Sequence, residues 1–249
     1  MALSGSYDFA LDRDAIITRA LLMIGAVGAG QTPTAAEITD GGETLNLLLK
    51  AWQADGLQLF TLTNISLTPV LSQYKYTFGP SGDIDTGATG PRPEEIFLVT
   101  RQRTADVTDI ALTRLARNDY WQLPNKTNTG TPTQCYFDSS IASGLANLYV
   151  WPAPDATFVS DYTIEIKYQK PFDDMDAATN DLAFPKSWTL AVTLGLAELL
   201  AIEYGTPLSD RRELREVAAI EKERVMNWDR ENPSVFFQPD QRVLGMWGR

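Results

Sequence analysis

Near the N-terminus, apolar positions recur at helical spacing and predict a first helix. Apolar residues between 16 and 24 repeat every three or four positions. Asp12 precedes them and is a suitable N-cap residue, because its carboxylate can accept a hydrogen bond from a first-turn amide. The glycines Gly25, Gly28 and Gly30 are expected to end this helix.

A second helix is predicted to begin at Thr34, with Glu37 three residues later in the spacing of a capping box. Its apolar face carries Leu45, Leu48, Leu49 and Trp52. Gly41 and Gly42 are expected to interrupt this segment, which then resumes and stops at Gly56. The two helices, joined by a glycine-rich link, are predicted to form an antiparallel hairpin.

From about Leu59 the apolar positions alternate with polar ones, which is typical of half-buried strands. The clearest alternation runs from Tyr162 to Tyr168. The segment from Leu145 to Trp151 is apolar on both faces, so we place it centrally in a sheet. Further strands are predicted over 61–67, 74–78, 96–99, 110–115 and 133–137, and one short helix over 115–121.

Helical spacing returns after Pro185. The segment from Ser187 to Tyr204 is apolar nearly all round and is therefore predicted to be the central helix of a bundle. Ser209 or Asp210 is expected to cap one more helix, which ends near residues 227–229. Its predicted inward-facing residues are Leu214, Val217, Ala218, Val225 and Trp228.

This order of elements predicts an α+β protein. We expect an α-helical bundle made of N- and C-terminal helices, with an inserted antiparallel β-sandwich or barrel-like domain. The helical domain is assigned to residues 1–58 and 183–230, the β domain to 59–182 and an extended tail to 231–249. A doubly wound parallel sheet is disfavoured, because no long helical pattern separates the strands.

Composition and charge exclude several classes of chemistry. The 249 residues include no histidine and one cysteine, Cys135. The formal net charge of the chain is −11. Histidine-dependent hydrolysis, histidine zinc sites and a disulfide framework are therefore excluded. An excess of acidic residues also disfavours binding to nucleic-acid phosphates. The N-terminus does not resemble a signal peptide, and the most apolar stretch, 190–202, is too short to span a bilayer. We expect synthesis in the cytoplasm.

The candidate chemical motifs are weak. Asp173, Asp174 and Asp176, like Asp83 and Asp85, fit solvated turns better than a calcium loop, although a glycosidase-like carboxylate pair stays open. The glycine pattern of 25–30 follows a helix, so it indicates a helix end rather than a phosphate loop. Cys135 is expected to be a packed thiol.

Two groups of side chains could instead contact a ligand or partner. Trp121 and Trp151 could form a sugar-stacking surface, although packing within the β domain is the simpler interpretation. Four arginines lie close together in the sequence of the β segment and could face a phosphate, an acidic partner or solvent. They are Arg101, Arg103, Arg114 and Arg117. The tail carries Phe236, Phe237 and Trp247, which either mark a partner surface or fold back onto the helices.

Four stretches of the chain are similar to one known family. They are Leu45–Leu57; Tyr74–Gly79 leading through Gly82–Ile84 to Arg92–Ile96; Leu148–Pro154 followed by Tyr162–Tyr168 and Pro171; and Glu231–Asp240. Together with the order of helices and strands, they resemble the head-to-tail adaptors of short-tailed phages. These proteins are also called tail tubular protein A or packaged-DNA stabilisation protein.

The resemblance implies a structural, non-enzymatic virion protein without cofactor or metal. Such adaptors form a ring, expected to be twelvefold, below the portal in the neck of the particle. The ring extends the DNA channel, retains packaged DNA and docks tail (nozzle) proteins, and DNA passes without specific binding. The C-terminal segment would contact the portal. Carried onto this chain, those residues are Val235, Phe236, Phe237, Gln238, Pro239, Arg242, Leu244 and Trp247.

Two alternatives remain open at the level of the sequence. The first is a carbohydrate- or receptor-binding β module of a phage tail, with Trp121 or Trp151 as its platform. The second is a hydrolase that uses only carboxylates. The adaptor interpretation differs from both, because it predicts head-to-tail self-association through an interface that closes into a ring.

Overall fold

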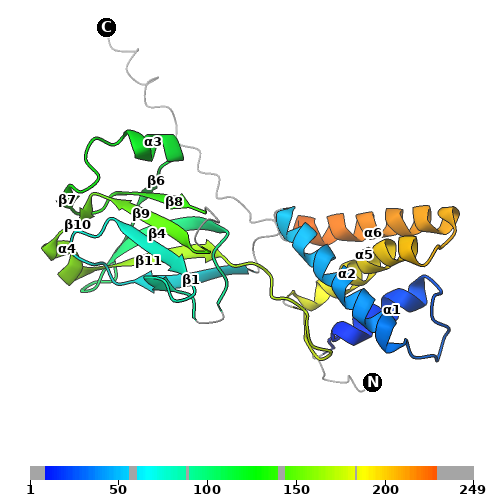
Figure 1. Ribbon diagram of the computed structural model, residues 1–249. Coiled ribbons are helices and arrows are strands. Elements are labelled where there is room, and N and C mark those ends of the chain that lie inside the picture. The colour runs from blue at the N-terminus through cyan, green and yellow to red at the C-terminus, as the bar shows by residue number, and fades with distance from the viewer. Residues whose placement is uncertain (1–8, 56–60, 88–89, 140–143, 183, 229–249) are drawn as a thin grey trace, which may run out of the picture.

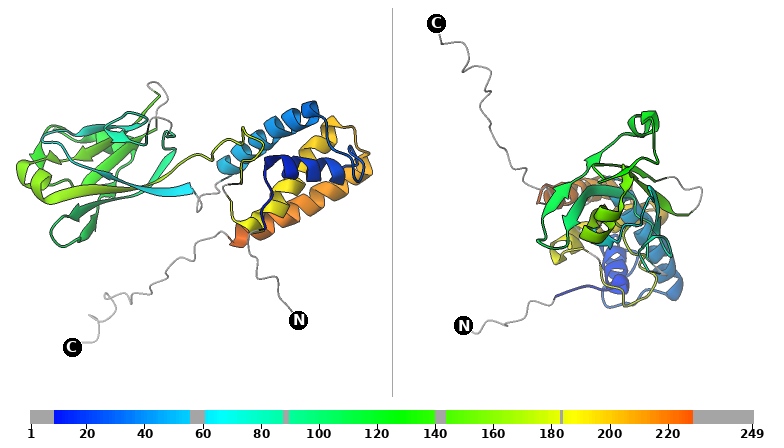
Figure 2. Two further views of the ribbon diagram at one scale, coloured as in Figure 1. Left: turned by 90° about the horizontal axis from the view of Figure 1, so that it is seen from below. Right: turned by 90° about the vertical axis from the view of Figure 1, so that its left-hand side faces the viewer.

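The computed structural model describes residues 9–55, 61–87, 90–139, 144–182 and 184–228, which form a mixed α+β protein. Four longer helices lie together, and the strands gather in a separate lobe (Figures 1 and 2). The longer helices are α1 (Arg13–Met23), α2 (Ala35–Ala54), α5 (Thr189–Glu203) and α6 (Leu208–Trp228). Shorter helical segments are α3 (Arg117–Gln122), α4 (Ala156–Asp161) and the 3-10 turn η2 (Lys186–Trp188).

The first two helices begin where local capping chemistry predicts. The Asp12 carboxylate accepts a hydrogen bond from the amide of Ala15 at 2.8 Å and caps α1. At α2, the Thr34 hydroxyl accepts from the amide of Glu37, and the Glu37 carboxylate accepts from the amide of Thr34. These contacts satisfy amides that have no partner within the first turn. The predicted capping box is confirmed.

The prediction that Gly41 and Gly42 interrupt the second helix is wrong. Helix α2 continues from Ala35 to Ala54 without a break. Both glycines are buried, and a Cβ on Gly41 would lie 2.5 Å from Cγ2 of Ile17 on α1. Glycine here permits close approach of two helices, and packing outweighs its low helix propensity.

Helix α5 contacts three other helices, α1, α2 and α6. Helix α6 begins at Leu208, ahead of the predicted caps Ser209 and Asp210, which instead lie in its first turn. Ala218 and Val225 face inward as predicted, whereas Val217 is exposed. The side chain of Trp228 lies outside the described residues.

One apolar cluster joins the helices that precede and follow the strands. Its buried members are Ile16, Ile17, Ala20, Leu21, Val27, Leu45, Leu48, Leu49, Trp52, Phe172, Met175, Phe184, Trp188, Ala191, Val192, Leu196, Ala197, Leu200 and Val225. Phe172 and Met175 belong to it although they lie within 59–182, the segment predicted to form the β domain. Their burial shows that the chain after the last strand already packs against the helices.

The strands form two larger sheets and one two-stranded pair. The first larger sheet has the order β1-β11-β4-β5 and the second β3-β2-β9-β8-β6, while β10 pairs with β7. The bounds are β1 Leu62–Leu67, β2 Lys75–Gly79, β3 Ile84–Asp85, β4 Glu95–Arg103, β5 Asp109–Ala111, β6 Thr113–Arg114, β7 Thr129–Gly130, β8 Gln134–Asp138, β9 Ala146–Trp151, β10 Ala153–Pro154 and β11 Tyr162–Gln169.

Both larger sheets contribute to a second apolar cluster. Ile164 and Ile166 of β11 lie in it together with Tyr76 and Phe78 of β2. The predicted inward face of β11 is confirmed, and the doubly apolar strand β9 lies in the middle of its sheet, as predicted.

Pairing within the β lobe is not purely antiparallel, which corrects the prediction. The long ladders, such as β1 with β11 and β8 with β9, are antiparallel. The short pairs β2 with β3, β6 with β8 and β10 with β7 are parallel. Each of these spans two residues, as expected where a loop returns briefly to a sheet edge. No closed barrel occurs among the described strands.

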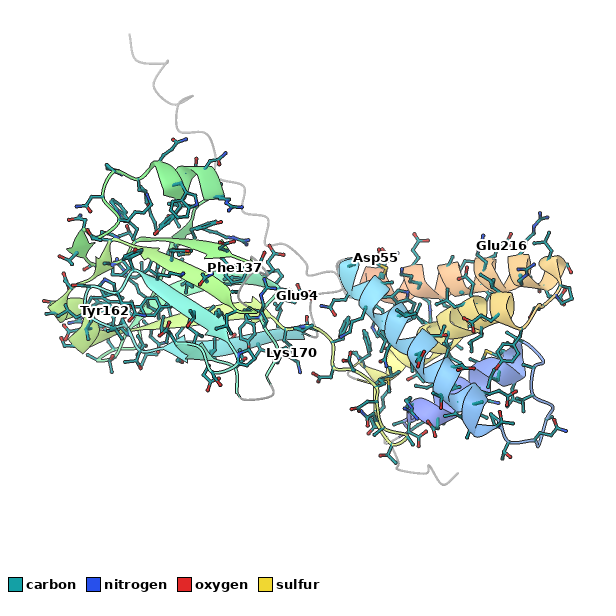
Figure 3. All side chains as sticks on the ribbon, in the orientation of Figure 1. Asp55, Glu94, Phe137, Tyr162, Lys170 and Glu216 are labelled. Atoms are coloured by element: carbon teal, nitrogen blue, oxygen red, sulfur yellow. The ribbon has the colours of Figure 1, made fainter. Side chains whose placement is uncertain are left out.

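The segment after β11 holds the end of α2. Lys50 Nζ lies 2.6 Å from the carbonyl of Phe172 and 2.8 Å from the carboxylate of Asp174. The side chain of Gln53 accepts a hydrogen bond from the amide of Phe172 at 3.0 Å. Figure 3 labels Lys170, where the chain leaves the strands, and Asp55 at the end of α2. The chain therefore enters the helical cluster through a hydrogen-bonded connection.

Candidate interaction surfaces

The residues predicted to bind a portal lie outside the described part of the chain. They are Val235, Phe236, Phe237, Gln238, Pro239, Arg242, Leu244 and Trp247. Their assignment therefore stays a prediction. The described helices, in contrast, present three surfaces with distinct chemistry.

The outer face of α6 carries charges of both signs. Glu216 lies on this outer side (Figure 3). Arg215 pairs with Glu198 of α5 at 2.9 Å, and Lys222 pairs with Asp55 at 2.7 Å. The ammonium of Lys222 also lies 5.1 Å from the ring centre of Trp52. These contacts hold α6 against its neighbours, so part of the charge on this helix serves packing.

An apolar groove of about 360 Å³ lies between α1 and the beginning of α5. Its lining includes Phe9, Met23 and Leu190, which are 72%, 46% and 46% exposed. Arg19 and Lys186 also line it, and none of the described residues around it is acidic. In a chain with a net charge of −11, this is an apolar surface with a basic border.

An acidic stripe runs along the exposed side of α2. Asp40, Glu43 and Leu47 follow each other at helical spacing, and Leu47 is 70% exposed. Tyr204, after α5, lies near the N-terminal end of this stripe. Burial raises the pKa of its hydroxyl, and the nearby charges of Glu37 and Asp40 raise it further. The stripe therefore combines a protruding aliphatic side chain with negative charge.

The sequence pattern does not predict the groove. The segment 187–204, which is apolar nearly all round, was predicted to be the central helix of a bundle, whereas Leu190 at the start of α5 is half-exposed. A helix that is apolar on every face but packed on only some of them leaves apolar surface uncovered. Finding the uncovered face requires the packing of the other helices.

The two tryptophans proposed as a sugar platform have packing roles in the structure. The ring of Tyr120 stacks on Tyr136, with centroids 5.3 Å apart, and Trp121 lies edge-on to Tyr120. The ammonium of Lys126 lies 5.2 Å from the Trp121 ring centre. Trp151 donates its indole hydrogen to the carbonyl of Asn125 at 2.8 Å. These contacts favour the packing interpretation of Trp151, whereas Trp121 makes packing contacts but is still 51% exposed.

Tyr120, Tyr136 and Tyr149 form a buried aromatic cluster, and burial raises the pKa values of their hydroxyl groups. Burial, together with smaller effects of the nearby Tyr149 and Tyr74, raises the pKa of Tyr120 to about 12. The Tyr120 hydroxyl is buried without a hydrogen-bond partner in the described structure. Tyr120 therefore stays neutral at physiological pH.

Two of the four arginines singled out in the sequence are held by backbone carbonyls. Arg101 donates to the carbonyl of Pro132 at 3.0 Å. Arg114 donates to the carbonyl of Ile96 at 2.6 Å and pairs with Glu95. Arg103 pairs with Asp106 in the turn that follows β4. Arg117 begins α3 and is exposed. The arginines are therefore distributed among local contacts rather than gathered on one ligand.

The acidic runs act as turn and connection residues. Asp83 accepts hydrogen bonds from the amide and hydroxyl of Thr77, and these bonds lower the pKa of its carboxyl. Asp173 pairs with Lys170 and Asp174 with Lys50. In the described ranges, no group of three metal-ligating side chains comes together.

Cys135 and the glycine-rich link also have structural roles. Cys135 is buried in β8, and burial raises the pKa of its thiol to about 11 although Arg114 opposes the shift. Gly25 and Gly30 have positive φ angles of 71° and 83° after the end of α1. Gly25 directly follows the C-cap residue Ile24 and ends α1, as predicted, whereas Gly30 lies in the loop before α2.

None of the described helices is long and apolar enough to cross a membrane. Comparison of the chain with protein-family models and with curated protein sequences finds no match.

Proposed function

We propose that this chain is a head-to-tail adaptor that forms a ring below a phage portal and extends the channel for DNA. The proposal rests on the resemblance of four sequence stretches to that family. The structural observation that supports it is the sharing of one apolar cluster by α1 and α2, which precede the strands, and α5 and α6, which follow them.

We propose that two parts of the chain have different roles in the particle. Residues 1–58 and 183–230 form a helical bundle that builds the ring, and 59–182 form a β-sandwich-like insertion directed towards tail proteins. The separate apolar cluster of the strands supports this division. Phe172 and Met175 pack with the helices, so the boundary between the β insertion and the helical bundle lies before residue 172 rather than at 182.

The charge of the chain suits a channel protein. A wall that carries negative charge repels DNA phosphates, so DNA can slide without binding to it. We propose that acidic residues of the ring line the channel. A map of the assembled ring with a basic or neutral lumen would contradict this part of the proposal.

The C-terminal segment is proposed to dock on the portal through its apolar residues. Large apolar side chains at an interface centre contribute most of the binding energy. Replacing Phe236 and Trp247 by alanine should therefore abolish portal binding. Gln241→Ala provides the matched control, because Gln241 lies in the same segment but is not among the residues predicted to contact the portal, and this variant should bind like the wild type.

Deletion of 231–249 gives the sharper test of portal docking. The truncated chain should keep the circular dichroism and melting curve of the full chain but fail to sediment with portal rings. Binding of the truncated chain at wild-type level would overturn the role of the tail. Loss of folding on truncation would instead assign the tail to the helical cluster.

A further inference from the structure

The groove and the acidic stripe both combine apolar side chains with charge, and their charges are opposite. The groove is apolar and bordered by Arg19 and Lys186, whereas the stripe has the protruding Leu47 with Asp40 and Glu43 beside it. The groove is formed by α1 and α5, and the stripe by α2. Because these helices are fixed in one apolar cluster, a chain cannot place its own stripe into its own groove.

The spacing of charge and apolar side chain is the same on both surfaces. Arg19 precedes Met23 by four residues on α1, and Glu43 precedes Leu47 by four residues on α2. Each charge therefore lies one helical turn, about 6 Å, from its apolar neighbour. Neither Arg19 nor Glu43 forms an ion pair with another described residue. Both are exposed.

We propose that Leu47 of one copy of this chain inserts into the groove between α1 and α5 of a second copy. Glu43 of the first copy then faces Arg19 of the second, and Asp40 faces Lys186. The two contacting surfaces are different, so the contact is heterologous and repeats from copy to copy. Such a contact generates a ring when its rotation closes. This inference deepens the proposed adaptor function and rests on it for the closed ring, but the pairwise contact is testable alone.

Cysteine cross-linking tests the pairing directly in the full chain. Copies that carry Met23→Cys are mixed with tagged copies that carry Leu47→Cys, under mild oxidation with and without portal rings. The native Cys135 is buried and does not compete. We expect a disulfide-linked dimer that contains one copy of each variant. Ile220→Cys on α6 is the control, because this exposed apolar residue lies outside both surfaces.

Charge reversal tests the polar part of the contact. Arg19→Glu and Glu43→Arg should each weaken self-association about tenfold, because each places like charges at the border of the groove. The double variant restores opposite charges and should recover association. Arg212→Glu, an equal change of charge on α6, should leave association near the wild-type level.

The outcomes separate this inference from the proposed function. If rings form on the portal but the mixed cross-link does not, the pairing is overturned and the adaptor function stands. The same holds if the Arg19→Glu variant assembles into rings as well as the wild type does. A mixed cross-link without portal rings supports the pairing and contradicts the adaptor function. Absence of both the cross-link and the rings overturns both.

Discussion

A Cβ atom added to Gly41 would lie 2.5 Å from Cγ2 of Ile17, which is closer than a methyl group can approach. The neighbouring Gly42 has its nearest such atom, Nη1 of Arg13, at 3.7 Å, an ordinary contact distance. Two consecutive glycines on one helix thus differ in their environment. Gly41 marks the point where α1 crosses closely over α2.

Gly41→Ala is therefore expected to destabilise the helical lobe by about 1–3 kcal/mol through overpacking. Gly42→Ala should instead raise stability by up to about 1 kcal/mol, because alanine favours the helix and has room. Urea unfolding followed by far-ultraviolet circular dichroism measures both. Equal effects of the two substitutions would show that the close approach to Ile17 does not constrain this position.

The contrast between these glycines also shows what the sequence could predict. The caps of α1 and α2 are local, since Asp12, Thr34 and Glu37 bond to amides within three residues, and they were predicted correctly. The uninterrupted helix at Gly41 depends on Ile17, which is 24 residues away in the chain. The helix propensities of Gly41 and its neighbours in the sequence cannot predict that contact.

The same distinction explains the other differences. The alternation in β11 was sufficient to identify its buried face, because period two assigns every residue to one side. Val217 and Ala218 were both expected to face inward, but the position of α6 on α5 buries Ala218 and leaves Val217 exposed. The groove and the acidic stripe likewise arise from helix packing and have no signature in a single segment.

Val107 is expected to be strained. It has a φ of 55° at the exposed turn between β4 and β5, a conformation that β-branched residues rarely adopt. Val107→Gly should raise stability by about 0.5–1 kcal/mol by removing this strain. Ala105→Gly in the same turn is the control and should lower stability slightly, because it only adds freedom to the unfolded chain. A loss of stability in Val107→Gly, measured by urea unfolding, would contradict the strain.

Cys135 is expected to make stability decline at alkaline pH. The pKa of its thiol rises from 9.0 to about 11 on folding, so the folded protein favours the neutral thiol. The contribution of the neutral Cys135 thiol to the free energy of unfolding is complete below pH 9 and is lost as the pH rises through about 11. Near pH 10 the wild type should have lost about 1 kcal/mol relative to Cys135→Ala. A constant difference between the two proteins from pH 8 to pH 10.5 would argue against this shift.

Trp151 is expected to stabilise the β lobe rather than bind sugar. Its indole hydrogen bonds to Asn125, so Trp151→Ala removes both packing and a hydrogen bond. We expect a loss of about 1–3 kcal/mol in stability. Glycan-array and calorimetric titrations of the wild type should show no saturable binding. Saturable sugar binding that disappears in a folded Trp151→Ala variant would favour the alternative β module.

The most direct test of the adaptor function is assembly on the portal. The full chain is mixed with portal rings from the same phage, and the product is examined by mass measurement and negative-stain microscopy. We predict a second ring stacked on the portal, with a copy number that matches the portal. An intact portal that binds no ring at saturating protein concentration would contradict the adaptor function.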